Sequence, residues 1–274
     1  MSNSNLIILR RIKLLYLVSF MLCLFANSAS AGSVGWFYAL DADKAAFEKV
    51  AGSPLRTVTL IGGTVVSEYR VGPHKVVAAK MGSGCVATAV TVTRVMAMNP
   101  FDRLISTGPA GAIGEGPQKG DWVRVAEVVG WQQGKIGEGG QEISSISASE
   151  QGGTKGSDWP VGSWSEMRGV KLVSGEAFIA SSEKRGELAR DYQAQIVEMN
   201  SLGILMSIKE TPVKVLILRV LSDFANEQAN EDFASFLKTY GGEGGKMVAE
   251  LVQSLPIGQD EPAAHGALKK LLEE

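Results

Sequence analysis

The sequence predicts an α/β protein with three layers, in which helices flank a central mixed sheet. Two observations carry this prediction. Short runs of apolar and β-branched residues recur along the chain, and segments with helical periodicity lie among them. Strands that alternate with helices favour a partly parallel sheet, because each helix carries the chain back across it. A chain of 274 residues is long enough for one large domain of this kind.

The expected strands are short and rich in Val, Ile, Leu and Thr, which fit a buried, pleated surface. The last of them is the most strongly apolar. They lie at Arg56–Leu60, Lys75–Ala79, Arg103–Thr107, Asp121–Val129, Val170–Ser174, Gln195–Val197 and Lys214–Leu221.

The expected helices repeat apolar residues every three or four positions. They lie at Asp41–Val50, Ala87–Met98, Ser182–Tyr192, Ser201–Lys209 and Asp232–Ser254. Between Gly130 and Arg168 the composition shifts to Gly, Ser, Gln and Trp without periodicity, which indicates an excursion from the sheet. Its residues Trp131, Trp159 and Trp164 either stack on a ligand base or, as we favour, pack the excursion against the domain.

The N-terminus has the three-part layout of a secretory signal: basic residues at 10–13, an apolar run at 14–26 and small residues at 29–31. The apolar run is shorter than the ~20 residues that a transmembrane helix needs. We expect a signal peptide at 1–31, an α/β domain at 32–255 and a polar tail at 256–274. The mature protein is then exported, periplasmic or extracellular, with no membrane partner; an uncleaved anchor is the alternative.

Composition excludes several kinds of partner. The 29 acidic residues nearly balance the 27 basic ones and no Lys/Arg cluster follows the signal, which argues against nucleic acid. Cys85 is the only cysteine after the predicted cleavage, so neither a disulfide framework nor a thiolate metal site is expected. His74, expected at the surface after a Gly-Pro turn, and His265 show no ligand spacing. No metal or organic cofactor is implied, and a small molecule is the expected partner.

Glycine turns and carboxylates follow several of the predicted strands. In open α/β sheets, ligands bind beyond the carboxyl ends of the strands, where glycines allow close backbone approach. Asp223 follows the most apolar strand, where it is either a functional carboxyl or a helix N-cap. These segments are Met81–Gly84, Thr107–Gly111, Ser174–Phe178, Val197–Asn200 and Leu221–Ala225.

Taken in order, these motifs resemble the nucleoside phosphorylase/nucleosidase superfamily, and within it the 5′-methylthioadenosine/S-adenosylhomocysteine nucleosidases. The resemblance runs from about Gly35 to Leu255 and implies a nucleoside phosphorylase-like fold. It is carried by Thr107–Gly111, Gly120-Asp121, Ser174–Ile179, Val197–Met199 and Ser222–Ala225, followed by Phe233 and Phe236.

The resemblance implies roles for the matching residues. Asp223 would protonate N7 of the purine, and Asp43 stands where these nucleosidases carry the glutamate that activates water. Phe178 would stack on the base, while Phe233 and Leu40 would wall the 5′ substituent. The implied substrate-binding residues are Leu40, Gly108, Ala110, Gly111, Phe178, Ile179, Glu198, Met199, Asn200, Ser222, Ala225 and Phe233. Such an acid and carboxylate suit N-glycosidic cleavage through an oxocarbenium-like sugar.

The sequence also departs from the family pattern. Asn200 replaces a second glutamate that holds the ribose hydroxyls, and Asp43 is one methylene shorter than the expected residue. Pro109 replaces a residue that is usually serine. Ser106 stands where phosphorylases of the superfamily carry a phosphate-binding arginine, which favours water as the second substrate. The remaining possible anion ligands are Arg70, Arg94 and Arg219.

We therefore expect an exported enzyme that hydrolyses the N-glycosidic bond of a purine nucleoside. Asn200 is expected to reduce or redirect its activity, and the resemblance implies a homodimer. One alternative is a catalytically weakened protein that binds or stores nucleosides. Another is a purine nucleoside phosphorylase, which the serine at position 106 disfavours.

Overall fold

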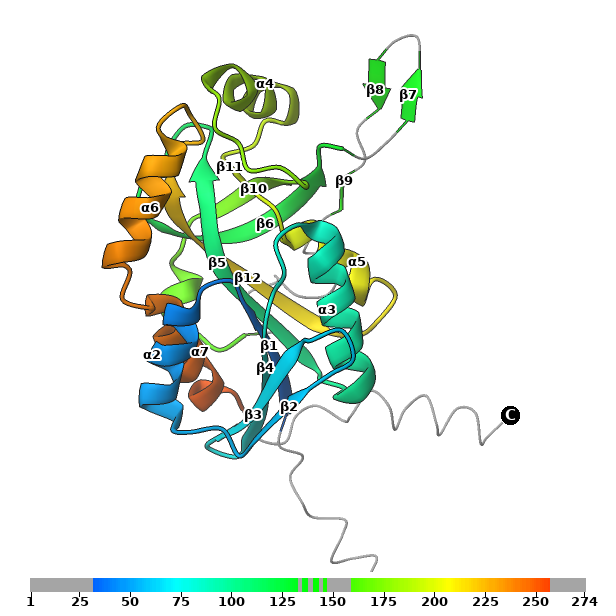
Figure 1. The fold of residues 1–274 in the computed structure, drawn as a ribbon, viewed down its shortest axis with the longest axis vertical. Helices are drawn as coiled ribbons and strands as arrows, with labels where there is room; N and C mark the ends of the chain where they lie inside the picture. The colour runs from blue at the N-terminus through cyan, green and yellow to red at the C-terminus, as the bar shows by residue number, and fades with distance from the viewer. Residues whose placement is uncertain (1–31, 133–134, 138–139, 143–144, 147–158, 257–274) are drawn as a thin grey trace, which may run out of the picture.

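The computed structural model describes residues 32–132, 135–137, 140–142, 145–146 and 159–256. The signal peptide predicted at 1–31 lies outside these residues, as do His265 and the predicted tail from residue 257 onward. Within the described residues a ten-stranded sheet and its surrounding helices form the core of the domain (Figure 1).

The strands follow the apolar runs of the sequence. Those of the large sheet are β1 (Ser33–Tyr38), β2 (Arg56–Thr59), β3 (Val65–Val71), β4 (His74–Lys80), β5 (Arg103–Ala112), β6 (Trp122–Gly130), β9 (Ser145–Ile146), β10 (Gly169–Ser174), β11 (Ile196–Glu198) and β12 (Lys214–Asp223). A separate pair consists of β7 (Lys135–Gly137) and β8 (Gly140–Glu142).

The helices lie between these strands. They are α2 (Asp41–Ala51), α3 (Cys85–Met98), α4 (Ser182–Tyr192), α5 (Ser201–Ile208), α6 (Ala229–Thr239) and α7 (Glu243–Ser254), with a short 3-10 turn at Ser163–Ser165.

The order along the sheet is β11-β10-β6-β12-β5-β1-β4-β3-β2. Strand β1 runs parallel to both β4 and β5, and its last residue, Tyr38, lies opposite Lys80 and Thr107. The carboxyl ends of these three strands therefore meet at one edge, and the residues that follow them begin the same cluster of turns. Because β2, β3 and β6 pair antiparallel to neighbours, the predicted mixed sheet is confirmed.

The sheet does not remain an open layer. Strand β11 pairs with β10 on one side and antiparallel with β5 on the other, so β5, β12, β6, β10 and β11 close into a ring. Strands β5 and β12 are ten residues long, and a register shift between Leu221 and Asp223 bends β12 near its end. This bend and the normal twist of a sheet bring the far strands back together. The predicted plain three-layer arrangement is corrected accordingly.

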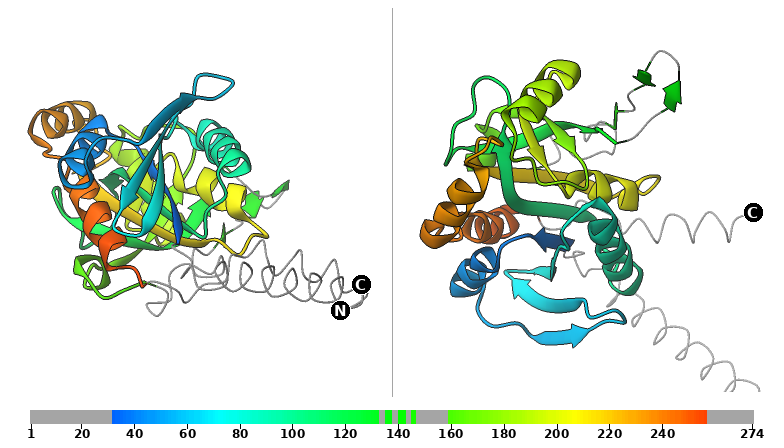
Figure 2. Two further views of the ribbon diagram at one scale, coloured as in Figure 1. Left: turned by 90° about the horizontal axis from the view of Figure 1, so that it is seen from below. Right: turned by 45° about the horizontal axis from the view of Figure 1, so that its top comes forward.

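Helices cover the two sides of the strands. Helices α2 and α7 pack together on one side, with α6 beside them, and α3 packs with α5 on the other (Figures 1 and 2). Side chains of α3 and α5 such as Val92, Val95 and Leu205 join one buried apolar cluster. Phe47 of α2 and Val248 of α7 join another. These two buried clusters anchor the helices to the sheet and thereby hold in place the sheet edge at which the turns gather.

Most predicted elements are confirmed, with some corrections. Strands β1 and β3 lie where no strand was predicted, and so do the short strands β7, β8 and β9 within the predicted excursion. The predicted helix Asp232–Ser254 is two helices, since the chain turns at Gly242, whose φ of 79° suits glycine. Trp159 and Trp164 are buried in the cluster of β1, α2 and α7, so the packing interpretation holds for both.

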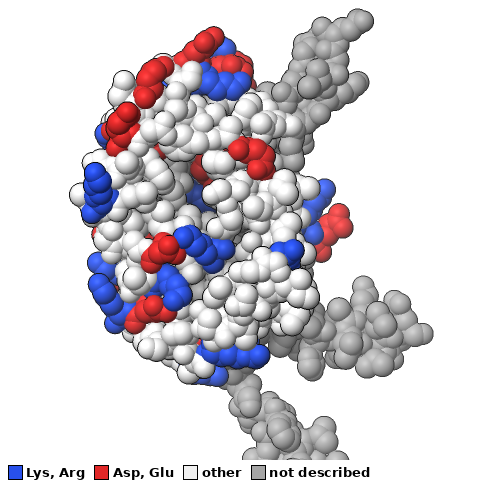
Figure 3. Space-filling view, viewed as in Figure 1, with Lys and Arg blue, Asp and Glu red and all other residues white. Residues whose placement is uncertain are grey.

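On the face drawn in Figure 3, acidic and basic side chains are interspersed and form no patch of one charge. Across the described residues, no helix is both long enough and apolar enough to cross a bilayer.

Candidate active site

A cavity of about 450 Å³ opens where the turns gather at the carboxyl ends of the strands. Its lining residues range from the end of β1 to α6, so segments that are far apart in the sequence come together to form it. It is lined by Ala39, Leu40, Lys80, Met81, Gly82, Ser83, Pro109, Ala110, Gly111, Phe178, Val197, Glu198, Met199, Asn200, Ser222, Asp223 and Phe233.

The structure brings most of the predicted site residues together in this cavity. Ile179 instead lines a small adjoining cavity that it shares with Phe178 and Asp223. Gly108 lies where β5 passes β1, because a Cβ there would come within 2.9 Å of the Ala39 Cβ. Gly108 thus serves close strand packing at the edge of the site.

Several lining residues were not predicted as site residues: Ala39, Lys80, Met81, Gly82, Ser83, Pro109 and Val197. The glycine turn after β4 was a usable signal for Gly82 and Ser83. Lys80 carried no signal, since a lysine that ends a strand is ordinarily a solvated residue.

Asp223 ends β12 with its carboxyl group at the cavity wall and only 2% of the residue exposed. Its Oδ1 accepts a hydrogen bond from the Ala225 backbone N–H at 2.8 Å, and its Oδ2 accepts one from the Ser222 hydroxyl at 2.7 Å. Burial raises the pKa of Asp223, and these two hydrogen bonds oppose the shift. Asp223 therefore retains its proton to a higher pH than a solvated aspartate, as a general acid requires.

The turn around this carboxyl group depends on glycine at position 111. A Cβ on Gly111 would lie 2.8 Å from Oδ1 of Asp223 and 3.1 Å from the Ala225 Cβ. Ala225 itself adopts a positive φ of 53° so that its N–H points back at the carboxylate. The backbone conformation thus supplies one of the two fixed partners of Asp223.

A buried ion pair lies beneath the cavity. Arg219 donates to Oε2 of Glu198 from Nη2 at 3.0 Å and from Nε at 3.2 Å, and their side chains are 1% and 4% exposed. Arg219 also donates to Ser106 Oγ at 3.0 Å and to Ser201 Oγ at 2.9 Å. Of the three candidate anion ligands, Arg219 alone is near the site, and its charge is already compensated.

Glu198 is the acceptor around which the lining segment of Glu198, Met199 and Asn200 is organised. Besides Arg219, it accepts hydrogen bonds from the Ser174 hydroxyl and from the backbone N–H groups of Asn200 and Ser201. These donors and Arg219 occupy both carboxylate oxygens. We therefore assign Glu198 to holding Met199 and Asn200 against the cavity.

Asn200 uses its side-chain amide to donate, to the Gly82 carbonyl at 2.7 Å and to the Thr88 hydroxyl at 2.6 Å. A glutamate could not donate to the Gly82 carbonyl, because a carboxylate has no hydrogen to donate, and it could only accept from the Thr88 hydroxyl. Asn200 thus ties its segment to the turn before α3.

Asp43 is not among the lining residues. It is fully buried between α2 and α7, where Oδ1 accepts from the Tyr240 hydroxyl at 2.5 Å and from the Gly245 N–H at 3.3 Å, and Oδ2 accepts from Thr107 Oγ1 at 3.1 Å. Burial raises the pKa of Asp43, and these hydrogen bonds oppose the shift. The helices approach so closely that a Cβ on Gly245 would lie 1.8 Å from the Asp43 carbonyl oxygen. The structure thus places Asp43 at the start of α7, and the cavity lining does not include it.

Aromatic rings join this buried aspartate to the cavity wall. Phe178 and Phe233 have ring centroids 6.0 Å apart, Phe233 and Phe236 are 6.4 Å apart, and Phe236 and Tyr240 are 4.8 Å apart. Phe178 is 44% exposed, and it offers a ring face to a planar ligand. None of the three tryptophans of the excursion lines the cavity.

The histidine and the cysteine among the described residues, His74 and Cys85, lie outside the cavity and are buried. His74 is buried, with Nε2 3.1 Å from the Leu255 carbonyl oxygen, which corrects its expected exposure. Burial raises the pKa of the Cys85 thiol to about 11, so its position at the start of α3 does not activate it. The described residues contain no group of three His, Cys, Asp or Glu side chains able to hold a metal ion.

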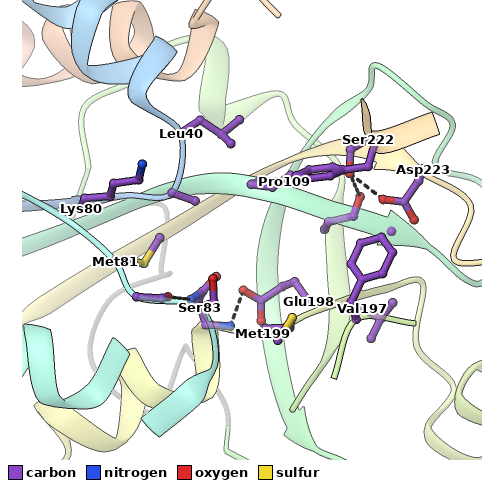
Figure 4. Close-up of a pocket in the computed structure, with 17 residues that line it drawn as sticks. Leu40, Lys80, Met81, Ser83, Pro109, Val197, Glu198, Met199, Ser222 and Asp223 are labelled. Carbon is purple, nitrogen blue, oxygen red and sulfur yellow. Dashed lines mark hydrogen bonds between the residues drawn. The ribbon is translucent and has the colours of Figure 1, made fainter. Parts of the chain in front are cut away.

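Figure 4 shows how the lining residues divide the cavity. Asp223 and Ser222 lie at one end, Lys80 and Leu40 at the opposite end, and Glu198, Met199 and Ser83 along the side between them. The arrangement offers an acid, a mostly apolar wall and a single cation at successive positions along one elongated space.

Comparisons with known proteins identify related sequences and folds. The sequence model of a family described as the phosphorylase superfamily matches residues 34–253. A 5′-methylthioadenosine/S-adenosylhomocysteine nucleosidase of Staphylococcus haemolyticus is 27% identical over 197 residues, which cover 68% of this chain and 83% of that protein. A nucleosidase of the same name from Haemophilus influenzae is 26% identical over 223 residues, which cover 73% of this chain and 90% of that protein.

Solved structures show the same fold. The 5′-methylthioadenosine/S-adenosylhomocysteine nucleosidase of Neisseria meningitidis, in complex with methylthio-immucillin-A, matches with a TM-score of 0.67 and 26% identity, over 82% of this chain and 100% of that one. The futalosine hydrolase of Helicobacter pylori matches with a TM-score of 0.68 and 20% identity, over 82% of this chain and 99% of that one.

Proposed function

This chain belongs to the phosphorylase superfamily, and from that membership we propose that it is an exported purine nucleosidase that hydrolyses the N-glycosidic bond of a methylthioadenosine- or S-adenosylhomocysteine-like nucleoside. The observation that carries the proposal is the buried carboxyl group of Asp223 at the cavity wall, whose pKa burial raises. Its curated relatives, matched over most of their length, are named as nucleosidases.

The reaction begins with the acid. Asp223 donates its proton to N7 of the purine, and the C1′–N9 bond then breaks with its electron pair leaving on the neutral base. The sugar becomes an oxocarbenium ion, water adds through its oxygen at C1′, and the proton that this water releases restores Asp223 through solvent. The sugar cation is a strong electrophile, so the main demand on the protein is protonation of the leaving group.

The other lining residues position the nucleoside. Phe178 presents its ring to the base, and the peptide segment of Met199 and Asn200, fixed by Glu198, faces the ribose. Leu40 and Phe233 lie on the wall that would surround the 5′ substituent. A positioned substrate contributes to rate by removing the entropy cost of bringing the groups together.

Hydrolysis is favoured over phosphorolysis by the charges near the cavity. The guanidinium of Arg219 is paired with Glu198, and Arg70 and Arg94 are exposed residues that do not line the cavity. The start of α3 is also occupied, because the Glu176 carboxylate accepts the Val86 N–H at 2.9 Å. A phosphate requires several free donors, and this arrangement does not favour one.

A nucleoside-binding protein of weak activity is the second candidate. It is favoured by Asp43, whose carboxylate is engaged by Tyr240, Thr107 and Gly245 and leaves the cavity without the predicted water-activating base. Asn200 also donates where a carboxylate was expected to accept.

The proposal includes the cellular location and the assembly. The secretory layout of residues 1–31 supports export to the periplasm or the exterior. A homodimer is supported by the resemblance and by apolar side chains exposed beside the cavity, with Val86 69% and Phe178 44% exposed. Size-exclusion chromatography with light scattering tests the dimer, and N-terminal sequencing of the mature protein tests cleavage.

The activity is tested by chromatographic detection of free base from methylthioadenosine, S-adenosylhomocysteine, adenosine and inosine, with and without phosphate. Base release that needs no phosphate and is lost in Asp223→Asn supports the nucleosidase. Asp191→Asn, at an exposed position on α4, is the matched control. Calorimetric binding without base release supports the second candidate, and strict dependence on phosphate would indicate a phosphorylase.

A further inference from the structure

Lys80 is the only cation among the described residues that line the cavity. It lies at the end opposite Asp223, next to Leu40 (Figure 4). The other two charged lining residues are already engaged: Asp223 is the proposed acid, and Glu198 is paired with Arg219. The ammonium group of Lys80, by contrast, is held at the rim, where its Nζ lies 2.6 Å from Oδ2 of Asp41.

The sheet fixes where these two rim charges stand. Lys80 ends β4 and pairs in register with Tyr38 of β1, and Asp41 begins α2 three residues after Tyr38. Both backbones are therefore held by the parallel pairing of β1 and β4. A positive and a negative group stand side by side at the mouth of the cavity as a consequence of the fold.

This rim pair is available to a ligand. The side chains of Lys80 and Asp41 are 49% and 77% exposed, and an exposed pair of this kind contributes little to stability. Separating Lys80 from Asp41 so that each can bind a ligand group therefore costs little free energy. The buried pair of Arg219 and Glu198 is the opposite case, because its charges cannot be separated without a large desolvation penalty.

Resting on the proposed function, we propose that Lys80 and Asp41 select nucleosides whose 5′ arm ends in an amino-acid group. The carboxylate of the arm binds the Lys80 ammonium, and its ammonium binds Asp41. The Ser83 hydroxyl, on the lining between Lys80 and the segment that begins at Glu198, adds a polar contact along the arm. Lys80 and Asp41 thus determine specificity, and they take no part in bond cleavage.

A zwitterionic arm fits this rim better than a phosphate or an alkyl group. Asp41 lies against Lys80 and would repel a dianion. The start of α3 does not compensate, because the carboxylate of Glu176 already accepts a hydrogen bond from the Val86 N–H. A plain methyl arm would bury against Leu40 and Phe233 but leave both rim charges without a new partner.

The test compares two thioether nucleosides with the same base and sugar. The kcat/KM for base release is measured with S-adenosylhomocysteine and with 5′-methylthioadenosine, for the wild type, Lys80→Gln, Asp41→Asn and Lys75→Gln. Lys75 lies on the same strand, with its side chain 42% exposed and outside the cavity, so it is the matched control. Adenosine 5′-monophosphate is the third ligand and represents a phosphate arm.

The wild type is expected to prefer S-adenosylhomocysteine by about tenfold, the low end for hydrogen bonds to charged groups at an exposed site. Lys80→Gln and Asp41→Asn should each remove most of this preference through KM, whereas Lys75→Gln should retain it. Equal kcat/KM for the two thioethers in the wild type, or a preference that survives Lys80→Gln, overturns the proposal. Stronger binding of the monophosphate overturns it in favour of a phosphate arm.

Failure of the proposed function can be distinguished from failure of the proposed role of Lys80 and Asp41. If the wild type releases base from neither thioether, the nucleosidase proposal fails. The arm preference is then measured by calorimetric binding of the same three ligands to the same variants. Equal affinities for the two thioethers in that measurement would also overturn the role of Lys80 and Asp41.

Discussion

The hydroxyl group of Tyr240 donates a 2.5 Å hydrogen bond to Oδ1 of Asp43, inside the contact between α2 and α7. The same hydroxyl accepts the Gly244 N–H at 3.0 Å, so it joins the aspartate to the first turn of α7. Tyr240 also follows α6, which carries Phe233 of the cavity wall. We therefore regard Asp43 and Tyr240 as residues that position this wall.

Tyr240→Phe should destabilise the protein by about 1–3 kcal/mol, because it leaves the buried carboxyl group of Asp43 without its shortest partner. Urea unfolding followed by circular dichroism measures this loss. A double-mutant cycle with Asp43→Asn isolates the interaction, and additive effects of the two changes would contradict direct coupling.

Asp43→Asn should lower the unfolding free energy and retain base release within about tenfold, since the side chain does not line the cavity. Turnover per folded molecule, with the folded fraction taken from the unfolding curve, is the relevant measurement. If turnover instead falls by about two to four orders of magnitude at unchanged stability, Asp43 reaches the water after all.

Asp223→Asn should slow turnover by about two to four orders of magnitude, the usual contribution of a positioned acid. The stability of the folded state, in contrast to turnover, should not fall in this variant. Because the native pKa of Asp223 is raised, its contribution to stability is complete below the unfolded pKa and is lost as the pH rises through the native pKa. The variant should thus unfold at a temperature no lower than the wild type at pH 7, and lose any advantage below the unfolded pKa of about 3.9.

Under the proposed function, the Ser222 hydroxyl should tune the pH range of activity. Its hydrogen bond lowers the pKa of Asp223 against the effect of burial, so Ser222→Ala should raise that pKa. Activity requires the protonated acid, and the alkaline limb of the kcat/KM profile should therefore move to higher pH. A limb that moves to lower pH, or that persists unmoved in Asp223→Asn, would contradict the assignment of this limb to Asp223.

Asn200→Glu restores the residue type of the family pattern but should not restore activity. It replaces two donated hydrogen bonds, to Gly82 and Thr88, with a carboxylate close to the one on Glu198. A loss of about 1–3 kcal/mol is expected. Asn200→Asp, with nearly the same shape, separates the effect of charge from that of size. Faster turnover in either variant would mean that position 200 limits catalysis.

The sequence predicted the parts of the fold that depend on local pattern. The apolar run of β12 is found as a strand that ends at the cavity, and Gly111 also lines the cavity, although it lies within β5 and not in the turn predicted after Thr107. Strand β1 was missed because it is buried on both faces and short, so it has no alternation to detect. The Gly-Gly sequence at 241–242 was the available signal that α6 and α7 are separate helices.

Other features of the site depend on residues far apart in the chain. Asp43 meets Tyr240 across 197 positions, and Lys80 meets Asp41 through strand pairing, so neither contact has a local signature. The pairing of Arg219 with Glu198 was likewise invisible, although a charged residue inside the most apolar strand was a hint that it had a buried partner. The ring closure by β11 also depends on pairing that periodicity does not reveal.

The closed ring of strands has a consequence for the order of folding. Strand β5 has three partners in the sheet, β1, β12 and β11, and the last two lie about 85 to 110 positions later, so a large part of the contact order is non-local. Asp223 at the end of β12 and Phe233 on α6 are the last of the described lining residues to be synthesised. An incomplete chain accordingly has no binding cavity, and acquisition of ligand affinity should report the final step of folding.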